Sequence, residues 1–210
     1  RIPFCVIEPA KRDYWKLLGS VKNLKVYSPG DDALPLRFNP LEPEEGVFIS
    51  SHVDDLMYAF SGAFEMDTPT MLTIEGLLQY TYENAGWSLD DIAYKRGRSF
   101  PTLRDMLNNM DEYSRREIRS GDEVRQNIEG AVIRRIKSLI TGTMGRITST
   151  SGQSITGREL CSTYSVIELD SLSVDTKSFV SSLILLKLSQ YIRQQDASHK
   201  LKNLILLEEA

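Results

Sequence analysis

The sequence contains little cysteine and no long apolar run. Its 210 residues include two cysteines, Cys5 and Cys161, which form neither a CxxC pair nor a Cys/His cluster. A disulfide framework and a zinc site therefore have little support, and we expect both residues to be reduced and to lie in the core. The longest apolar runs, such as residues 183–186, span only a few residues, whereas a membrane-spanning helix needs about 18. The segment 1–11 also lacks the pattern of a signal peptide, so we expect a cytoplasmic protein.

The sequence has no excess of positive charge. Its formal net charge is −4, which argues against a uniformly basic protein that coats nucleic acid. Any contact with DNA must then be local, and one candidate is the segment 115–137, which carries seven basic and four acidic residues. A solvated helix face is the commoner explanation of such a segment. With 41% hydrophobic and 26% charged residues, the composition is typical of a soluble globular protein, and its length suits one domain.

The spacing of apolar residues predicts strands toward both ends of the chain and helices between them. The predicted strands are residues 2–8, 24–27, 164–169 and 203–207. Nearly continuous apolar runs are typical of parallel strands that helices cover on both faces, so we expect the strands to be buried, including the last one. The order of elements predicts an α/β fold with a parallel sheet joined by right-handed crossovers.

Helical spacing dominates residues 50–140 and recurs at residues 175–195. The expected helix starts are at Ser51, Thr68, Ser88, Thr102 and Ser120, the last forming a capping box with Glu123. The Gly-, Ser- and Thr-rich stretch 142–157 predicts a loop or hairpin. We therefore divide the chain into a first part of the core (1–49), an inserted helical subdomain (50–142) and a second part of the core (143–210).

The remaining histidines and aromatics give no separate signal. His52 and His199 stand in polar contexts without metal-ligand spacing, so we expect them to be exposed to solvent. Tyr80, Tyr82 and Trp87 are expected in the subdomain core rather than on a base-stacking platform.

Two acidic residues, Glu208 and Glu209, follow the last apolar run. Successive side chains of a strand face opposite ways, and an unpartnered buried carboxylate is costly, so the pair should lie where the strand leaves the core. Ligands bind at that edge in open α/β sheets. The run fits a Walker B element, in which Glu208 holds Mg²⁺ and Glu209 orients or deprotonates the attacking water. An exposed strand end that happens to be acidic is the alternative.

Several blocks, in this order, carry a family resemblance: IPFCVIEPAKRDYWKL, LRFNPLEPEEG, ENAGW, SLITG, VIELDSL and NLILLEEA. Together they resemble the HerA/FtsK superfamily of hexameric DNA-pumping ATPases, in particular its HerA-like and conjugative type IV secretion branch. The resemblance spans almost the whole chain and implies a sheet of the RecA-like P-loop ATPase type. It also implies that the phosphate-binding loop precedes Arg1, and no GxxxxGK[ST] sequence occurs within the chain.

The resemblance also implies roles for individual residues. It places Glu208 and Glu209 at the Walker B positions, with a His expected just after Ala210. Glu8 then has a supporting polar role or is a structural strand-end acid. Asp170, after the strand VIEL, either contacts polar groups near the site or caps a turn. The set Lys11, Asp13 and Tyr14 matches a family stretch that reads Lys, any residue, Glu, Tyr, with Asp13 departing from it.

In ring ATPases of this kind, an arginine from the neighbouring subunit completes each site. Arg134 and Arg135 are our candidates, with an ordinary surface position on the long helix as the alternative. The leading hypothesis is a parent ATPase that uses ATP and Mg²⁺ in a homo-hexamer to move double-stranded DNA. The alternatives are an ATPase switch or assembly platform for a nuclease or secretion partner, and a helical interaction domain stabilised by a sheet.

Overall fold

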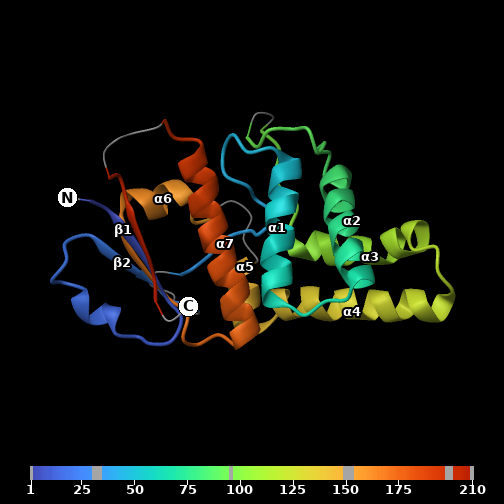
Figure 1. Ribbon diagram of the computed structural model, residues 1–210, viewed down its shortest axis with the longest axis horizontal. Helices are drawn as coiled ribbons and strands as arrows, with labels where there is room; N and C mark the ends of the chain where they lie inside the picture. The colour runs from blue at the N-terminus through green and yellow to red at the C-terminus, as the bar shows by residue number, and fades with distance from the viewer. Residues whose placement is uncertain (1, 30–34, 95–96, 149–153, 197–200, 209–210) are drawn as a thin grey trace.

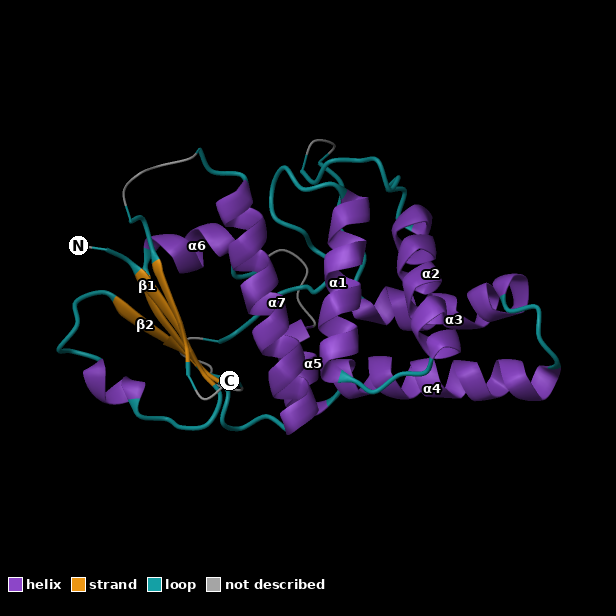
Figure 2. Cartoon of the chain, in the orientation of Figure 1, coloured by secondary structure: helices purple, strands orange, loops and turns teal. Residues whose placement is uncertain are grey.

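The computed structural model describes residues 2–29, 35–94, 97–148, 154–196 and 201–208. Within these residues, four strands form one parallel sheet in the order β2-β3-β1-β4 (Figures 1 and 2). The strands are β1 Phe4–Glu8, β2 Leu24–Tyr27, β3 Tyr164–Glu168 and β4 Leu204–Leu207. The predicted α/β fold with a parallel sheet is confirmed.

The two faces of the sheet are covered unequally. Alternate residues of the strands point to opposite faces, and Cys5, Ile7 and Ile167 belong to the main core that continues into the helices. On the other face, Val6, Val26 and Val166 form a small second cluster with Leu24, and Tyr14 and Val21 of the segment after β1 pack against it. On that face the described residues that pack against the strands belong to a short segment rather than to a layer of helices.

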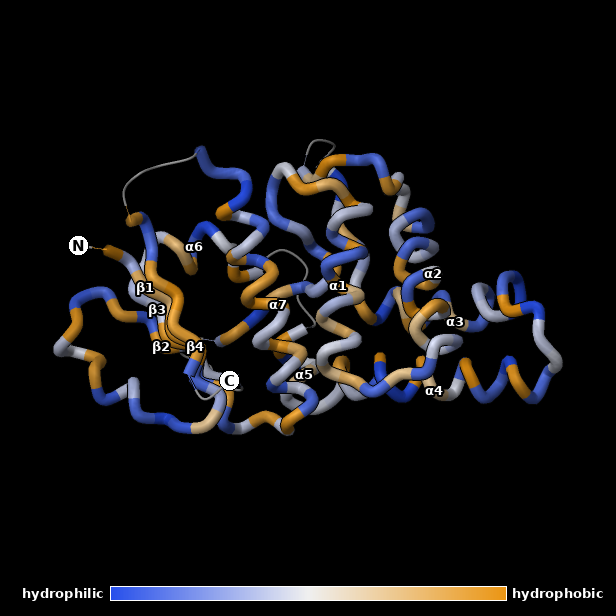
Figure 3. The backbone as a smooth tube through the Cα atoms, viewed as in Figure 1, coloured by the Kyte–Doolittle hydropathy of each residue, from blue (hydrophilic) through white to orange (hydrophobic). Residues whose placement is uncertain are grey.

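The last strand differs from the prediction of a buried strand. In β4, Leu204 is 49% exposed and Leu207 is 44% exposed. The strand pairs with β1, and no described strand lies on its other side. Figure 3 shows β4 as hydrophobic as its neighbours. An apolar run predicts a strand, but its burial depends on what other elements cover it.

Most of the helices lie to one side of the sheet (Figure 1). They are α1 Ile49–Ala63, α2 Thr68–Asn84, α3 Leu103–Glu117, α4 Asp122–Ile140, α5 Gly142–Thr148, α6 Gly157–Ser162 and α7 Val174–Arg193. The helix α7 stands between the sheet and α1, and the pair Phe60 and Phe179 joins α1 to α7 with ring centroids 5.0 Å apart. Tyr82 and Trp87 are buried in the core, as predicted. Among the described helices, none is long and apolar enough to cross a membrane.

The helix starts show where local sequence signals fail. The capping box at Thr102 is present, since Thr102 and Asp105 exchange side-chain to backbone hydrogen bonds. The predicted start at Ser51 is wrong, because the carbonyls of Asp91 and Leu89 accept from the N–H groups of Ile49 and Ser50. A neighbouring segment thus satisfies the first donors of α1, and the helix begins at Ile49 without a side-chain cap.

Three further local predictions are wrong. The long helix α4 begins after Gly121 with no side-chain cap, so Ser120 and Glu123 form no capping box. Ser88 starts a turn, in which its backbone N–H donates to Asp91 Oδ2 at 2.9 Å, and no helix. The stretch 142–148, predicted as loop, is the helix α5, whose Met144 and Ile147 are buried. Burial of these apolar side chains outweighs the low helix propensity of the glycines around them.

A buried polar cluster joins α1 to α7. His52 was predicted to be exposed, but it is 1% exposed, with Nε2 2.9 Å from the carbonyl of Pro40 and Nδ1 2.9 Å from Gln190 Nε2. Gln190 also donates to Asp55 at 2.9 Å. Burial lowers the pKa of His52 to about 3, so the imidazole is neutral. The sequence gives no sign of this burial because its polar partners come from distant segments. His199 lies outside the described residues.

An ion pair continues this buried region. Lys187 Nζ lies 3.3 Å from Glu44 Oε1, and both side chains are less than a tenth exposed. Glu44 also accepts from the backbone N–H of Gly157 at 2.9 Å. The loop before α1, the start of α6 and the middle of α7 are therefore held together by one buried charge pair.

Candidate functional site

Acidic side chains gather at the carboxyl edge of the sheet. Glu8 ends β1 and lies in register with Glu168, which ends β3. Glu208 follows β4, and its backbone N–H donates to the carbonyl of Ile7 at 3.1 Å. Glu8 and Glu168 are each 1% exposed, and Glu208 is half-buried. Parallel strands end at the same edge, which explains how three acids from distant parts of the chain come together.

Glu8 fixes the turn that leaves β1. Its Oε1 accepts from the backbone N–H groups of Ala10 at 2.8 Å and Lys11 at 2.9 Å. These bonds hold the segment after Pro9 in a turn, which leads to the short 3₁₀ helix η1, Tyr14–Leu17. The side chain of Glu8 therefore stabilises the backbone of this turn. Lys11 lies exposed on the same turn.

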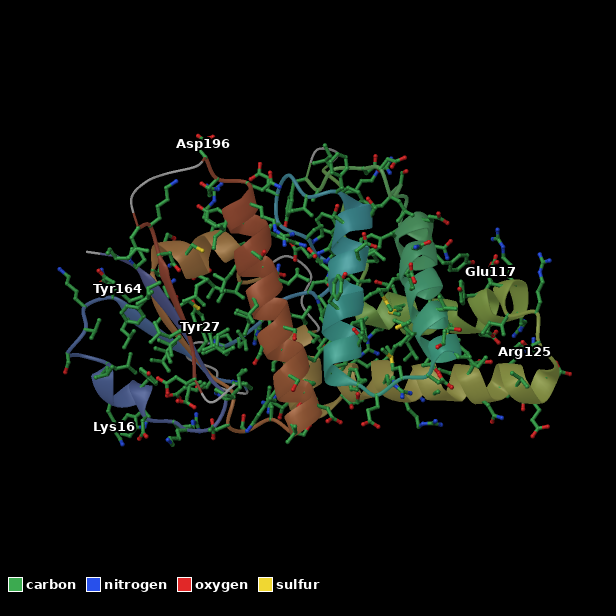
Figure 4. The ribbon with its side chains drawn as sticks, viewed as in Figure 1. Lys16, Tyr27, Glu117, Arg125, Tyr164 and Asp196 are labelled. Atoms are coloured by element: carbon green, nitrogen blue, oxygen red, sulfur yellow. The ribbon has the colours of Figure 1, made fainter. Side chains whose placement is uncertain are left out.

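Tyr14 joins the end of β3 to the end of β4 by hydrogen bonds. Its backbone N–H donates to Glu168 Oε1 at 3.1 Å, and its hydroxyl donates to Glu208 Oε1. The bond to Glu208, with a smaller effect of burial, raises the pKa of Tyr14 to about 12. Asp13, next to it, points to solvent and pairs with Lys16 at 2.5 Å (Lys16 is labelled in Figure 4). Of the matched stretch, Lys11 contacts Glu8 through its backbone N–H, and Tyr14 contacts Glu168 through its backbone and Glu208 through its side chain.

Glu168 and Arg12 were missed in the sequence. Arg12 Nε lies 3.7 Å from Glu168 Oε2 and 3.5 Å from Asp170 Oδ1. Ser28 Oγ donates to Glu168 Oε2 at 3.4 Å. A signal for Glu168 exists, because CVIE of β1 and SVIE of β3 end alike. No local signal indicates Arg12, because its partners, Glu168 and Asp170, lie at the end of β3 and just after it, more than a hundred residues later in the chain.

Asp170 lies beyond the end of β3, beside Arg12. Its Oδ1 atom is buried without a hydrogen bond among the described groups, and the guanidinium is its charge partner. This position puts Asp170 at the same edge as Glu168, where the sequence predicted it.

Glu208 is a carboxylate at this edge that is only half-buried. Carboxylate oxygen is a ligand that Mg²⁺ prefers, and Mg²⁺ in nucleotide sites binds one or two carboxylates, water and phosphate. Within the described residues, no three His, Cys, Asp or Glu side chains are placed to hold a metal by themselves. The donor set thus fits an ion that a nucleotide and water also coordinate. Glu209 lies outside the described residues.

Arg134 and Arg135 lie on α4, in the helical part of the chain. Both line a cavity of about 530 Å³ with Glu65 and Asp175. Arg135 Nη1 donates to the carbonyl of Ala131 at 3.0 Å, and Nη2 donates to the carbonyl of Glu65. Arg134 is exposed. Figure 4 shows Glu117 and Arg125, on α3 and α4, at the end of the molecule opposite Tyr27 and Tyr164 of the sheet.

The two cysteines are free. Cys5 is buried in β1 as expected, whereas Cys161, also expected in the core, is half-buried on α6. Burial raises the pKa of Cys5 to about 12 and that of Cys161 to about 11, so both are protonated thiols at neutral pH. Neither belongs to the acidic edge.

The sequence matches no protein-family model and no curated protein. The fold is similar to the solved structure of VirB4 of Thermoanaerobacter pseudethanolicus, with a TM-score of 0.67 and 15% sequence identity. The match covers 99% of this chain and 75% of that chain. At the level of fold, the chain therefore resembles this VirB4 structure.

Proposed function

We propose that the chain is part of an ATP-hydrolysing machine of the HerA type, which couples Mg²⁺-dependent hydrolysis to the movement of double-stranded DNA. The observation that carries the proposal is the bridge of Tyr14 between Glu168 and Glu208 at the carboxyl edge. That edge is where ligands bind in open α/β sheets. The fold similarity to VirB4 supports the same assignment.

In this proposal the chain supplies the acidic half of the site. Bound Mg²⁺ neutralises charge on the phosphates of ATP. Glu208 holds the ion through its carboxylate or through water, and Tyr14 fixes the direction of that carboxylate. Glu209 orients or deprotonates the attacking water. No GxxxxGK[ST] sequence is present in these residues, so a phosphate-binding loop outside them has to complete the site.

The ring and its arginine are further parts of the proposal. Arg134 is the better of the two candidates for an arginine that acts in a neighbouring subunit, because it is exposed, whereas Arg135 is engaged with the carbonyls of Ala131 and Glu65. Such an arginine is worth about 10³ to 10⁵ in rate. Its role requires a homo-hexamer or similar ring, in which α4 of one subunit faces the acidic edge of the next.

Two measurements test the proposal. The 210 residues alone should bind ATP weakly at most, and no more tightly with Mg²⁺ than without it, as calorimetry measures; tight Mg²⁺-dependent binding would refute the divided site. In the full-length protein, Glu209→Gln should abolish turnover and spare nucleotide binding. Full activity of that variant would remove Glu209 from the mechanism.

The second candidate function is an ATPase switch or assembly platform for a nuclease or secretion partner. The likeness to VirB4, whose fold the chain has, favours it. Steady hydrolysis that DNA stimulates supports the motor. A rate of ATP hydrolysis that DNA does not change but an added partner protein does change supports the switch.

A further inference from the structure

A pocket lies at the carboxyl edge, on the side of β2 and β3. It has a volume of about 350 Å³ and is lined by Arg12, Trp15, Leu18, Val26, Ser28 and Glu168. Glu208 follows β4, on the far side of β1 from this pocket. The pocket is therefore distinct from the proposed position of Mg²⁺, although Tyr14 contacts both acids.

The pocket combines an exposed aromatic ring with a buried carboxylate. Trp15 is 55% exposed, and no described residue makes a ring contact or an indole hydrogen bond with it. The other tryptophan, Trp87, is 2% exposed, stacks on Phe100 and donates its indole N–H to Ser99 at 3.0 Å. Exposing a tryptophan face forgoes a large apolar gain, which points to a partner for that face.

The polar side of the pocket is an acceptor. Glu168 is 1% exposed, and within the part of the chain that the structure describes its Oε2 has only the long contacts to Ser28 at 3.4 Å and Arg12 at 3.7 Å. An ionised carboxylate offers about four lone-pair sites, so Oε2 retains acceptor capacity. Glutamate and aspartate accept hydrogen bonds from the exocyclic amine of a base, as they do from cytosine in DNA.

We infer that this pocket binds a nucleobase that carries an exocyclic amino group. Trp15 stacks on the base, Leu18 and Val26 line its edge, and Glu168 accepts from the amine. Arg12, whose side chain is 53% exposed, lies at the rim, where it meets the phosphate of a nucleotide. Stacking alone tolerates every base, whereas the carboxylate favours adenine, cytosine and guanine over thymine and uracil. The base belongs to a free nucleotide or to a single strand.

The experiment titrates the 210-residue chain with nucleosides and follows tryptophan fluorescence, without Mg²⁺ or triphosphate. Because the probes lack phosphate and metal, the result is independent of the proposed ATPase function. We expect saturable quenching by adenosine and cytidine, and affinity for thymidine that is lower by at least about fivefold. Trp15→Ala should weaken adenosine binding by about fivefold or more, measured by calorimetry, while Trp15→Phe retains most of it.

Separate arms identify the polar contact and the source of the base. Glu168→Gln should reduce the preference for adenosine over thymidine, and a circular dichroism melt verifies that this buried variant folds. If it does not fold, the thymidine comparison in the unchanged chain decides the same point. Tighter binding of a short oligo-dA than of AMP assigns the base to a single strand, and the reverse assigns it to a nucleotide.

Three results would overturn the inference. The first is the absence of quenching by adenosine, and the second is equal affinity for thymidine. The third is quenching by methylguanidinium with none by adenosine, which would assign the pocket to a basic side chain of a protein partner.

Discussion

The hydroxyl of Tyr14 donates a hydrogen bond to Glu208, although 194 residues separate the two. Through this bond the segment that leaves β1 fixes the acid that follows β4. The backbone of the same residue is bonded to Glu168 of β3. One residue therefore ties three strand ends together at the proposed site.

Removing this hydroxyl should loosen Glu208. Tyr14→Phe is expected to lower the free energy of unfolding by about 1 kcal/mol, the usual net value of a hydrogen bond, in urea titrations. In the full-length protein, the same variant should lower kcat, because in the proposed function Tyr14 orients the carboxylate that holds Mg²⁺. Tyr58→Phe is the matched control, since Tyr58 is 78% exposed. Equal stability and kcat in both variants would contradict the bridge.

The same bond gives an alkaline pH dependence. The pKa of Tyr14 is raised from 10.0 to about 12, so the folded state holds this proton more tightly than the unfolded state. Its contribution is fully present below pH 10 and is lost as the pH rises toward 12. The difference in unfolding free energy between the unchanged chain and Tyr14→Phe should therefore shrink across this window. A difference that stays constant from pH 9 to about 12 would rule out the raised pKa.

His52 should give an acid-side dependence. Burial lowers its pKa to about 3 from 6.5, so between these values the unfolded state binds more protons and stability falls as the pH falls. His52→Gln, which can donate and accept in the same place, should flatten this part of the pH profile. Urea unfolding at a series of pH values from about 3 to 7 tests it. An unchanged slope in the variant would show that other groups cause the acid sensitivity.

The buried pair of Lys187 and Glu44 should show strong coupling. Lys187→Met or Glu44→Gln alone leaves one buried charge without its partner and is expected to cost about 3–5 kcal/mol. The double variant should recover a large part of this loss, as a double-mutant cycle in urea measures. Asp13→Asn is the exposed control, because its pair with Lys16 lies in solvent, and should cost less than about 1 kcal/mol. Additive losses in the cycle would contradict the pairing.

Gly157 marks a close approach of α6 to α7. A Cβ there would meet the carbonyl of Lys187 and would lie 2.7 Å from Tyr191 Cβ. Gly157→Ala is therefore expected to destabilise the chain by about 1–3 kcal/mol in thermal or urea unfolding. Gly62→Ala is the matched control, because nothing lies within 4 Å of a Cβ at Gly62, and there helix propensity favours alanine. Equal effects of the two variants would show that α6 and α7 can separate at no cost.

The local sequence pattern was enough to predict most of the strands and helices. Runs such as CVIE and SVIE are continuous and rich in β-branched residues, so they predict parallel strands, and both β1 and β3 are buried. The capping box at Thr102 was predictable as well, because its two partners are three residues apart. The start of α1 was not, since its first N–H groups bond to the carbonyls of Leu89 and Asp91.

The residues of the candidate site also divide into those that the sequence predicted and those that it did not. The acids that follow apolar runs, Glu8 and Glu208, were visible in the sequence, because a strand that ends in a carboxylate has to deliver it to the edge of the sheet. Arg12 and the bridging role of Tyr14 were not, because their partners belong to strands that follow much later in the chain.

The sequence by itself therefore determined the α/β class, the strands and the acids at their ends, since these depend on residues next to one another. Only the tertiary structure decided that β4 is exposed, that His52 is buried and that Tyr14 reaches Glu208. Each of these depends on which distant segment lies alongside, and the free energy of burial or of a hydrogen bond is realised only when that segment is in place.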